Sequence, residues 1–184
     1  MNEFKKFNYK IPGDISSASF FIVLTLLSKK TSLIIKNTNI NPSRTGIIQI
    51  LNMMGAKIKT IRKKKYKGEL TADIFIKSNK SLKAINLNPN LNSSAIDEFL
   101  LIFLVAAKAK GVSFFKDLNE LNQKESPRLK WGAKILNYLG VKYELKSDSI
   151  KIFGNSKLNN KNDVVIKNYL KDHRVFMTSV VASL

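Results

Sequence analysis

Three short polar segments hold the residues whose types and spacing could support chemistry on an anionic substrate. They are residues 13–19 (GDISSAS), 124–128 (KESPR) and 172–174 (DHR). Each lies just before or at the start of a predicted helix, where unpaired N–H groups and the positive end of the helix dipole attract anions. Ordinary helix capping explains any one of them equally well. Together, three converging helix starts would form a site for a phosphorylated substrate.

Arginine is rare in this chain, so its positions are informative. The 32 basic residues include only four arginines, Arg44, Arg62, Arg128 and Arg174. A guanidinium offers a planar pair of donors to a carboxylate or phosphate, whereas lysine offers one ammonium. Arg128 and Arg174 lie in two of the polar segments, which makes them the candidate anion ligands. Lys124 and Glu125, close to Arg128, are either part of the same site or an ordinary surface pair.

Composition excludes several classes of site. The sequence has no cysteine, which rules out disulfides, thiolate metal ligands and a cysteine nucleophile, and its one histidine, His173, argues against a zinc site. The longest clear apolar run, residues 99–107, has nine residues, about half of the ~18 that argue for a membrane helix. Residues 1–10 lack the apolar segment of a secretory signal.

The formal net charge of +19 has two interpretations. One is a polyanion partner, either nucleic acid or a membrane surface. The other is a lysine-rich bias on a solvated surface, which is favoured because the cations are scattered and the densest run, residues 62–65, is four long. Nucleic-acid binders also tend to use arginine forks and interleaved aromatic side chains, which this sequence does not display. In either case the charge would attract small phosphorylated molecules.

The chain repeats itself, and the repeat sets the expected fold. SLIIKN at residue 32 is matched by VSFFKD at residue 112, 80 residues later, and MMGAKIK at residue 53 by YLGVKYE at residue 138, 85 residues later. A third copy opens with DHRVFMTSVVASL at residue 172. With the offset of 80 residues, Asp97 in the second copy matches Ser17 in the first. The two copies therefore place a carboxylate and a hydroxyl at equivalent positions.

Each copy is predicted to run helix, strand, helix, strand, strand. The first helix is apolar nearly all round, which is typical of a buried helix. The second helix ends at Gly55 or Gly140, residues that suit the left-handed position after a helix. We expect helices at residues 16–27, 44–54, 99–107 and 127–139, and strands at residues 32–36, 112–116, 141–146 and 149–153.

This pattern predicts an α/β (α+β) fold of repeated units, with buried helices inside and sheets outside. We expect residues 1–78 to form the last unit of one domain and residues 79–184 the units of a second domain. The third unit has its first helix but not the strands that would cover it, so we expect the chain to be a fragment, a split gene product or a truncated gene.

The same segments, taken in order, resemble one enzyme family. IPGDISSASFF, NPSRTGIIQILNMMGA, IDE, KES-x-R and DHR are similar to the 3-phosphoshikimate 1-carboxyvinyltransferase family, also called 5-enolpyruvylshikimate-3-phosphate (EPSP) synthases. The resemblance spans about residues 9–184, and it implies the family's inverse α/β architecture with an active site between two domains. It also implies that this chain contains less than half of the residues of a usual family member.

The resemblance implies a reaction between two small phosphorylated acids. The family transfers the enolpyruvyl group of phosphoenolpyruvate to the 5-hydroxyl of shikimate 3-phosphate and releases phosphate, through addition and elimination and without a cofactor. By this resemblance Asp97 is the base and Glu125 moves the proton at the methylene carbon. Ser17, Asp97 and Lys124 bind shikimate 3-phosphate, and Arg128 and Arg174 bind phosphoenolpyruvate. His173 is a hydrogen-bonding neighbour.

Other functions stay open at this point. A related alternative is UDP-N-acetylglucosamine enolpyruvyl transferase, which shares the fold. Two others are a basic, non-catalytic nucleic-acid-binding module and a remnant that keeps only the fold. On the leading interpretation we expect a cytoplasmic protein of the shikimate pathway, either a monomer or joined to a complementary fragment, with no nucleic-acid or membrane partner.

Overall fold

The computed structural model describes residues 6, 8–158, 163–167, 169 and 171–184. The first unit contains α1 (Ile15–Leu27), β1 (Ser32–Asn39), α2 (Gly46–Met53), β2 (Lys59–Tyr66) and β3 (Glu69–Lys77). The second contains α3 (Phe99–Lys108), β4 (Gly111–Phe115), α4 (Arg128–Tyr138), β5 (Tyr143–Leu145) and β6 (Ile150–Gly154). α5 (His173–Ser183) follows, and four short 3₁₀ helices lie in the connections: η1 (Pro42–Arg44), η2 (Pro89–Leu91), η3 (Ser93–Ala95) and η4 (Asn119–Gln123).

The two units have the same path, which confirms the fold predicted from the repeat. Each forms a three-stranded antiparallel sheet, with strand order β1-β3-β2 in the first and β4-β6-β5 in the second. In both, the last strand of the unit is central. The predicted strands of residues 141–146 and 149–153 are shorter or shifted, at 143–145 and 150–154, with the expected turn between them.

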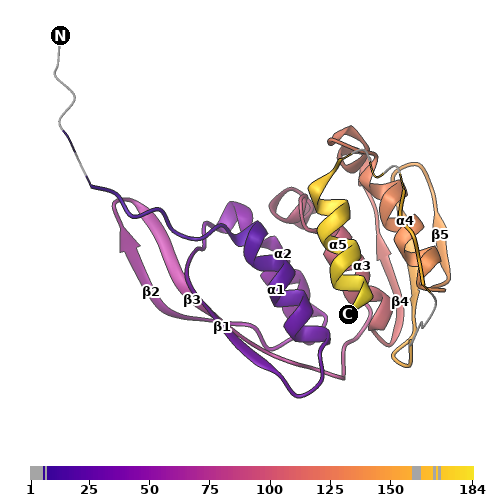
Figure 1. The fold of residues 1–184 in the computed structure, drawn as a ribbon, viewed down its shortest axis with the longest axis horizontal. Helices are drawn as coiled ribbons and strands as arrows, with labels where there is room; N and C mark the ends of the chain where they lie inside the picture. The colour runs from indigo at the N-terminus through magenta and orange to yellow at the C-terminus, as the bar shows by residue number, and fades with distance from the viewer. Residues whose placement is uncertain (1–5, 7, 159–162, 168, 170) are drawn as a thin grey trace, which may run out of the picture.

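α1, α2, α3 and α5 lie between the two sheets (Figure 1). α1, α3 and α5 contact one another pairwise, so the first helix of every copy joins one central group. Most buried apolar residues of both units belong to one hydrophobic cluster, and Leu100, Trp131 and Val175 form a second, smaller one. The connection after β3 also reaches the second sheet, because the Phe114 N–H donates to the Ile85 carbonyl and the Leu87 N–H to the Phe114 carbonyl. The division of residues 1–78 and 79–184 between two domains stays a prediction.

α3 is the most completely buried element. Every residue from 99 to 107 is at most 3% exposed, as its all-round apolar sequence predicts. Phe99, Phe103 and Phe115 contact one another through their rings, with centroids 5.4–6.1 Å apart. Burying a large apolar side chain contributes roughly 1.5–3 kcal/mol, so α3 anchors the second unit. Within the described residues, no helix is both long and apolar enough to span a membrane.

The ends of the second helices also match in the two units. Gly55 has φ 92° and Gly140 has φ 68°, and both glycine N–H groups donate back to the preceding turn. The N–H of the next residue then bonds five residues back, from Ala56 to Leu51 and from Val141 to Leu136, which completes a Schellman motif. At the other end of α4, Pro127 is the N-cap and the helix begins at Arg128. The prediction that this helix starts at Pro127 is therefore one residue early.

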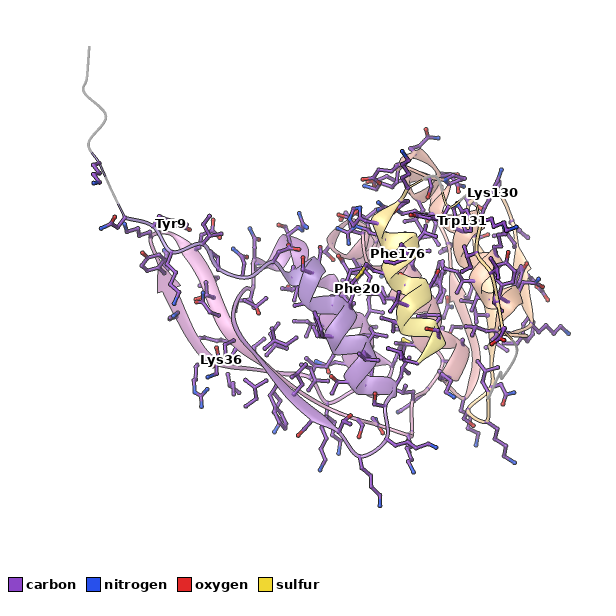
Figure 2. All side chains as sticks on the ribbon, viewed as in Figure 1. Tyr9, Phe20, Lys36, Lys130, Trp131 and Phe176 are labelled. Carbon is purple, nitrogen blue, oxygen red and sulfur yellow. The ribbon has the colours of Figure 1, made fainter. Side chains whose placement is uncertain are left out.

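Lysine side chains extend from the periphery of the molecule. Lys36 on β1 and Lys130 on α4, both exposed, are examples (Figure 2). Such solvated, scattered ammonium groups are what a lysine-rich compositional bias predicts.

Candidate active site

Arg128 is the centre of a charged site at the start of α4. Its side chain is 1% exposed, so its guanidinium must be paired inside the protein. Nε donates to Asp172 Oδ2 at 2.9 Å and Nη1 to Asp97 Oδ1 at 3.1 Å. Nη2 pairs with Glu125, one helical turn away in sequence. One arginine thus joins three carboxylates from three different segments.

Asp172 is positioned by two roles at once. It is the N-cap of α5, where Oδ1 accepts from the backbone N–H groups of Arg174 at 2.9 Å and Val175 at 3.4 Å. Oδ2 accepts from the Ser126 hydroxyl at 2.7 Å as well as from Arg128. Burial alone would raise the pKa of Asp172, but the hydrogen bonds from Arg128 and Ser126 and the Arg128 charge outweigh it and lower the pKa.

Arg174 approaches the same site from α5. Its Nη1 donates to the Asp97 carbonyl at 3.2 Å, and its Nη2 lies 3.4 Å from Asp97 Oδ2. Arg128 binds the other oxygen of that carboxylate. The two arginines, from the second and third copies, therefore lie on one face and share Asp97, as the convergence of the polar segments predicts.

Lys124 completes the group of cations. Its Nζ lies 3.7 Å from Asp97 Oδ1 and 3.0 Å from Glu120 Oε1. We call the resulting set the charged cluster; its members are Asp97, Glu98, Lys124, Glu125, Arg128, Asp172 and Arg174. It contains three cations and both candidate acid–base carboxylates, Asp97 and Glu125.

Ser17 and His173 are both exposed and are not members of the charged cluster. Ser17 is exposed on the first turn of α1, and its hydroxyl donates to the N-cap residue Asp14 at 3.0 Å. The preceding residue, Ser16, is the one that faces inward: it is 2% exposed and its hydroxyl accepts from Arg44 Nη2 at 3.0 Å. His173 is exposed as the first residue of α5.

Glu98 belongs to the site, although the sequence did not indicate a role for it. Asp97 and Glu98 look like helix caps from their position, but neither caps α3 through its side chain in the described structure. Glu98 is instead 2% exposed, with Oε1 3.5 Å from Arg174 Nη1. Burial raises the pKa of Glu98, and a Ser16 hydrogen bond and the Arg174 charge oppose this only in part. The available signal was the scarcity of arginine, since Arg44, Arg128 and Arg174 all surround this region.

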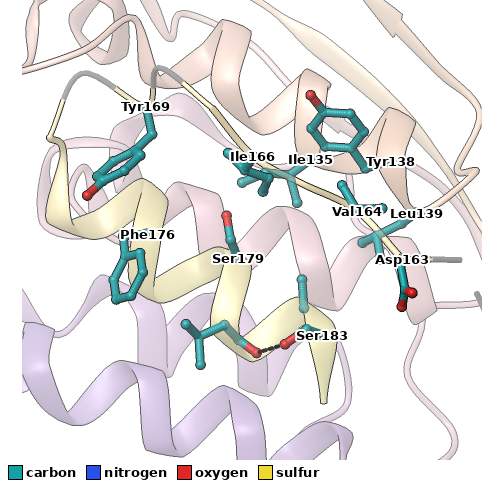
Figure 3. A pocket seen from close by; sticks show the side chains of 12 residues that line it. Ile135, Tyr138, Leu139, Asp163, Val164, Ile166, Tyr169, Phe176, Ser179 and Ser183 are labelled. Carbon is teal, nitrogen blue, oxygen red and sulfur yellow. Dashed lines mark hydrogen bonds between the residues drawn. The ribbon is translucent and has the colours of Figure 1, made fainter. Parts of the chain in front are cut away.

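Two cavities of the described residues lie away from this chemistry. One of about 650 Å³ lies between the end of α4, residues 163–167 with Tyr169, and α5 (Figure 3), lined by Ile135, Tyr138, Leu139, Asp163, Val164, Ile166, Tyr169, Phe176, Ser179, Val180, Ala182 and Ser183. No lining residue belongs to the charged cluster. Among the described residues, no group of three or more histidines or carboxylates is arranged to hold a metal ion.

The arrangement can bind anions and move protons. Three cations converge on one carboxylate, and an anionic substrate that enters must exchange with some of these protein pairs. Glu125, whose side chain is 58% exposed, is the partner most easily displaced from Arg128. Asp97 and Glu125 both bond Arg128, which holds two potential proton carriers beside the same guanidinium.

Comparison with known proteins identifies the family. The family model for EPSP synthase (3-phosphoshikimate 1-carboxyvinyltransferase) matches residues 2–184. The 3-phosphoshikimate 1-carboxyvinyltransferases of Petrotoga mobilis and Ruthia magnifica are 40% and 42% identical over 95% and 97% of this chain, which covers 39% and 40% of them.

Solved structures agree with the match. An EPSP synthase from Acinetobacter baumannii superposes with a TM-score of 0.84 at 34% identity, over 94% of this chain and 39% of that one. The enolpyruvyl transferase NikO from Streptomyces tendae has a TM-score of 0.64 at 14% identity, over 92% of this chain and 36% of its own, which is a likeness of fold alone. The chain therefore spans about two fifths of the length of these relatives, and it belongs to the EPSP synthase (3-phosphoshikimate 1-carboxyvinyltransferase) family.

Proposed function

We propose that this chain is part of an enzyme that transfers the enolpyruvyl group of phosphoenolpyruvate to the 5-hydroxyl of shikimate 3-phosphate. The products would be EPSP and phosphate, in the shikimate pathway that leads to chorismate and aromatic amino acids. Family membership gives the reaction class. The observation that carries the proposal is the sharing of Asp97 by Arg128 and Arg174, since it gathers two guanidiniums and a carboxylate at one point.

Phosphoenolpyruvate would bind to the two arginines. Its phosphate and carboxylate both suit a guanidinium fork. The phosphoenolpyruvate anion would replace the exposed Glu125 at Arg128, while Asp172 stays in place because its side chain is buried and bound on both oxygens. The bond from Nε to Asp172 would thus fix the orientation of Arg128, and its Nη1 and Nη2 groups would face the ligand.

Shikimate 3-phosphate would bind next to Asp97 and Lys124. Asp97 would take the proton of the 5-hydroxyl as the oxygen attacks C2 of phosphoenolpyruvate, and Glu125 would donate a proton to C3. In the second step, Glu125 would remove a proton from C3 as the C–O bond to phosphate breaks and the double bond re-forms. The departing phosphate would take the proton that Asp97 holds, which restores both carboxyl groups. Lys124 would stabilise the adjacent negative charge. Ser17 stays a prediction as a phosphate ligand, with its hydroxyl exposed at the start of α1.

The rest of the enzyme is part of this proposal. Because the chain spans about two fifths of its relatives, we infer that further segments complete the substrate cleft, either in one longer chain or as a complementary fragment. We expect the assembled protein to be a cytoplasmic monomer.

The test is phosphate release from phosphoenolpyruvate and shikimate 3-phosphate, with the missing segments supplied from the Ruthia magnifica relative. Arg128→Lys should weaken phosphoenolpyruvate binding roughly 10- to 100-fold, because one charge-assisted hydrogen bond contributes about 1.5–3 kcal/mol. Arg62→Lys is the matched control, since Arg62 is exposed on β2 and pairs with Asp73. Should Arg128→Lys fail to fold, Arg174→Lys tests the same ligand.

The acid–base assignment has its own pair of variants. Glu125→Gln should lower turnover while substrate binding is largely kept, whereas Glu144→Gln, on the second sheet and paired with Lys151, should behave as the unmodified protein. Equal turnover and affinity in all variants, or no phosphate release from the assembled protein, would show the proposal to be wrong.

A further inference from the structure

Glu98 is a buried carboxylate that the proposed reaction does not use. The residue is 2% exposed, and within the described part of the chain its Oε1 atom has no hydrogen-bond partner. Arg174 Nη1 lies 3.5 Å from Oε1, which is an ion-pair distance without a good hydrogen bond. A buried carboxylate oxygen without a hydrogen-bond partner destabilises the folded state, so its presence here calls for a functional explanation.

Glu98 lies where the three copies meet. Asp97 precedes it in the second copy, Arg174 reaches it from α5, and Ser16 reaches it from the first turn of α1. Arg44, at the end of η1, acts on it by charge and binds the Ser16 hydroxyl. Within the described part of the chain, these are the charged and polar groups that act on Glu98.

Two adjacent carboxylates hold the same guanidinium in different ways. Asp97 is partly exposed and is shared with Arg128 and Lys124. Glu98 is buried and faces only Arg174 among the members of the charged cluster at ion-pair distance. When Glu98 is ionised it cancels part of the charge that Arg174 offers to a ligand. When it is protonated, that charge becomes available.

We propose that Glu98 is a positioning residue for Arg174. It orients the guanidinium, and by gaining or losing a proton it sets how strongly Arg174 attracts an anion. Its raised pKa, caused first by burial, brings the proton exchange closer to neutral pH. Anion binding at Arg174 should therefore be tighter at lower pH and should be accompanied by proton uptake. That the natural anion is phosphoenolpyruvate rests on the proposed function; the coupling between Glu98 and Arg174 does not.

The coupling can be measured directly, because the chain contains only four arginines. Their side-chain Nε–H signals can be followed by NMR on the 184-residue chain as the pH is changed. We expect the Arg174 signal to shift with pH, and Glu98→Gln to abolish that step. Glu120→Gln, which alters an exposed carboxylate bound to Lys124, should leave the step in place.

Sulfate is a suitable probe of the effect on anions, because its charge is constant between pH 4 and 8. The sulfate concentration that half-saturates the Arg174 shift should rise several-fold as Glu98 ionises, and it should vary much less with pH in Glu98→Gln. Histidine also titrates in this range, so both titrations are made in a His173→Gln background.

Three results would overturn the inference: an Arg174 signal that is insensitive to pH, the same pH step in Glu98→Gln, or an unchanged dependence of sulfate binding on pH. If Glu98→Gln does not fold, carbon-13 titration of the six glutamate carboxyls in the unmodified chain replaces it. One carboxyl should then titrate above the rest and together with Arg174. Failure of phosphoenolpyruvate to shift any arginine signal in the protein assembled with the segments of the relative would contradict the proposed function and leave the Glu98 assignment intact.

Discussion

Replacement of Asp172 by asparagine tests whether the buried ion pair, rather than helix capping, holds the site together. The Asp172 carboxylate accepts from Arg128, from Ser126 and from the first turn of α5. Asparagine keeps the shape of the side chain and is as good an N-cap as aspartate. Asp172→Asn therefore removes the charge opposite Arg128 and leaves most of the cap in place.

The expected cost follows from the burial of both partners. The side chains of Arg128 and Asp172 are 1% and 0% exposed, and breaking such a pair by removing one partner costs about 3–5 kcal/mol. Arg128 keeps Asp97 and Glu125, so the lower value, about 3 kcal/mol, is expected. Asp172→Ala should cost about 1 kcal/mol more, because it also removes the cap.

Urea unfolding of matched variants gives the measurement. Asp14 is the N-cap of α1, and its side chain is 53% exposed beside Arg44. Asp14→Asn should cost less than about 1 kcal/mol, since an exposed ion pair contributes little. If Asp172→Asn and Asp14→Asn lower the free energy of unfolding equally, the central role given to the Arg128 pair is wrong.

The cost of Asp172→Asn should also depend on pH with a definite sign. The pKa of Asp172 is lowered below its ordinary value of 3.8, so the unfolded chain binds a proton at higher pH than the folded protein does. The stabilisation is complete above that ordinary value and is lost as the pH falls through the lowered pKa. The difference between the two proteins should therefore shrink only below about pH 4.

Three further predictions concern the core and the buried glutamate. Leu104→Asp should abolish folding, since an unpaired buried charge costs several kcal/mol, whereas Leu145→Asp, at a 40% exposed position, should melt almost normally by circular dichroism. Gly154→Ala should destabilise by about 3 kcal/mol, because the new Cβ would lie 2.0 Å from a backbone oxygen at the end of α3. At Gly140 a new Cβ would meet no other atom, and only the positive φ opposes alanine. Gly140→Ala should therefore lower the free energy of unfolding by only about 1 kcal/mol in the same urea assay. Because the pKa of Glu98 is raised in the folded state, the folded protein keeps this proton at pH values where the unfolded chain has lost it. The free energy of unfolding should therefore fall as the pH rises from about 4.5 to that raised pKa. Glu98→Gln should remove this dependence on pH.

Local signals in the sequence were enough for most of the fold. Gly55 and Gly140 mark the same helix end in both copies, and the all-round apolar sequence of α3 predicts its burial. Such features act within a few residues, so they can be read without knowing the partners of a segment. The repeat then transferred each assignment from one unit to the other.

The site was harder, because it depends on which side of a helix each residue faces. Consecutive residues in a helix point about 100° apart. Ser16 and Ser17 are therefore indistinguishable by type, yet one is buried against Arg44 and the other is exposed at Asp14. The pairing of Arg128 with Asp172 joins residues 44 positions apart, and no local pattern specifies such a contact.

The charged cluster depends on α5, the helix with the fewest buried residues among the three that form the central group. α5 buries Val175, Thr178 and Val181, while Phe176, Val180 and Leu184 are between 40% and 84% exposed. A helix with so few buried contacts opens at a lower free energy than the core does. Each opening of α5 would withdraw both Asp172 and Arg174 and leave Arg128 with its remaining partners. On the proposed function, the fraction of molecules able to bind an anion at Arg174 would therefore depend on the docking of this one helix. A segment that covered α5 would then strengthen anion binding without contacting the ligand.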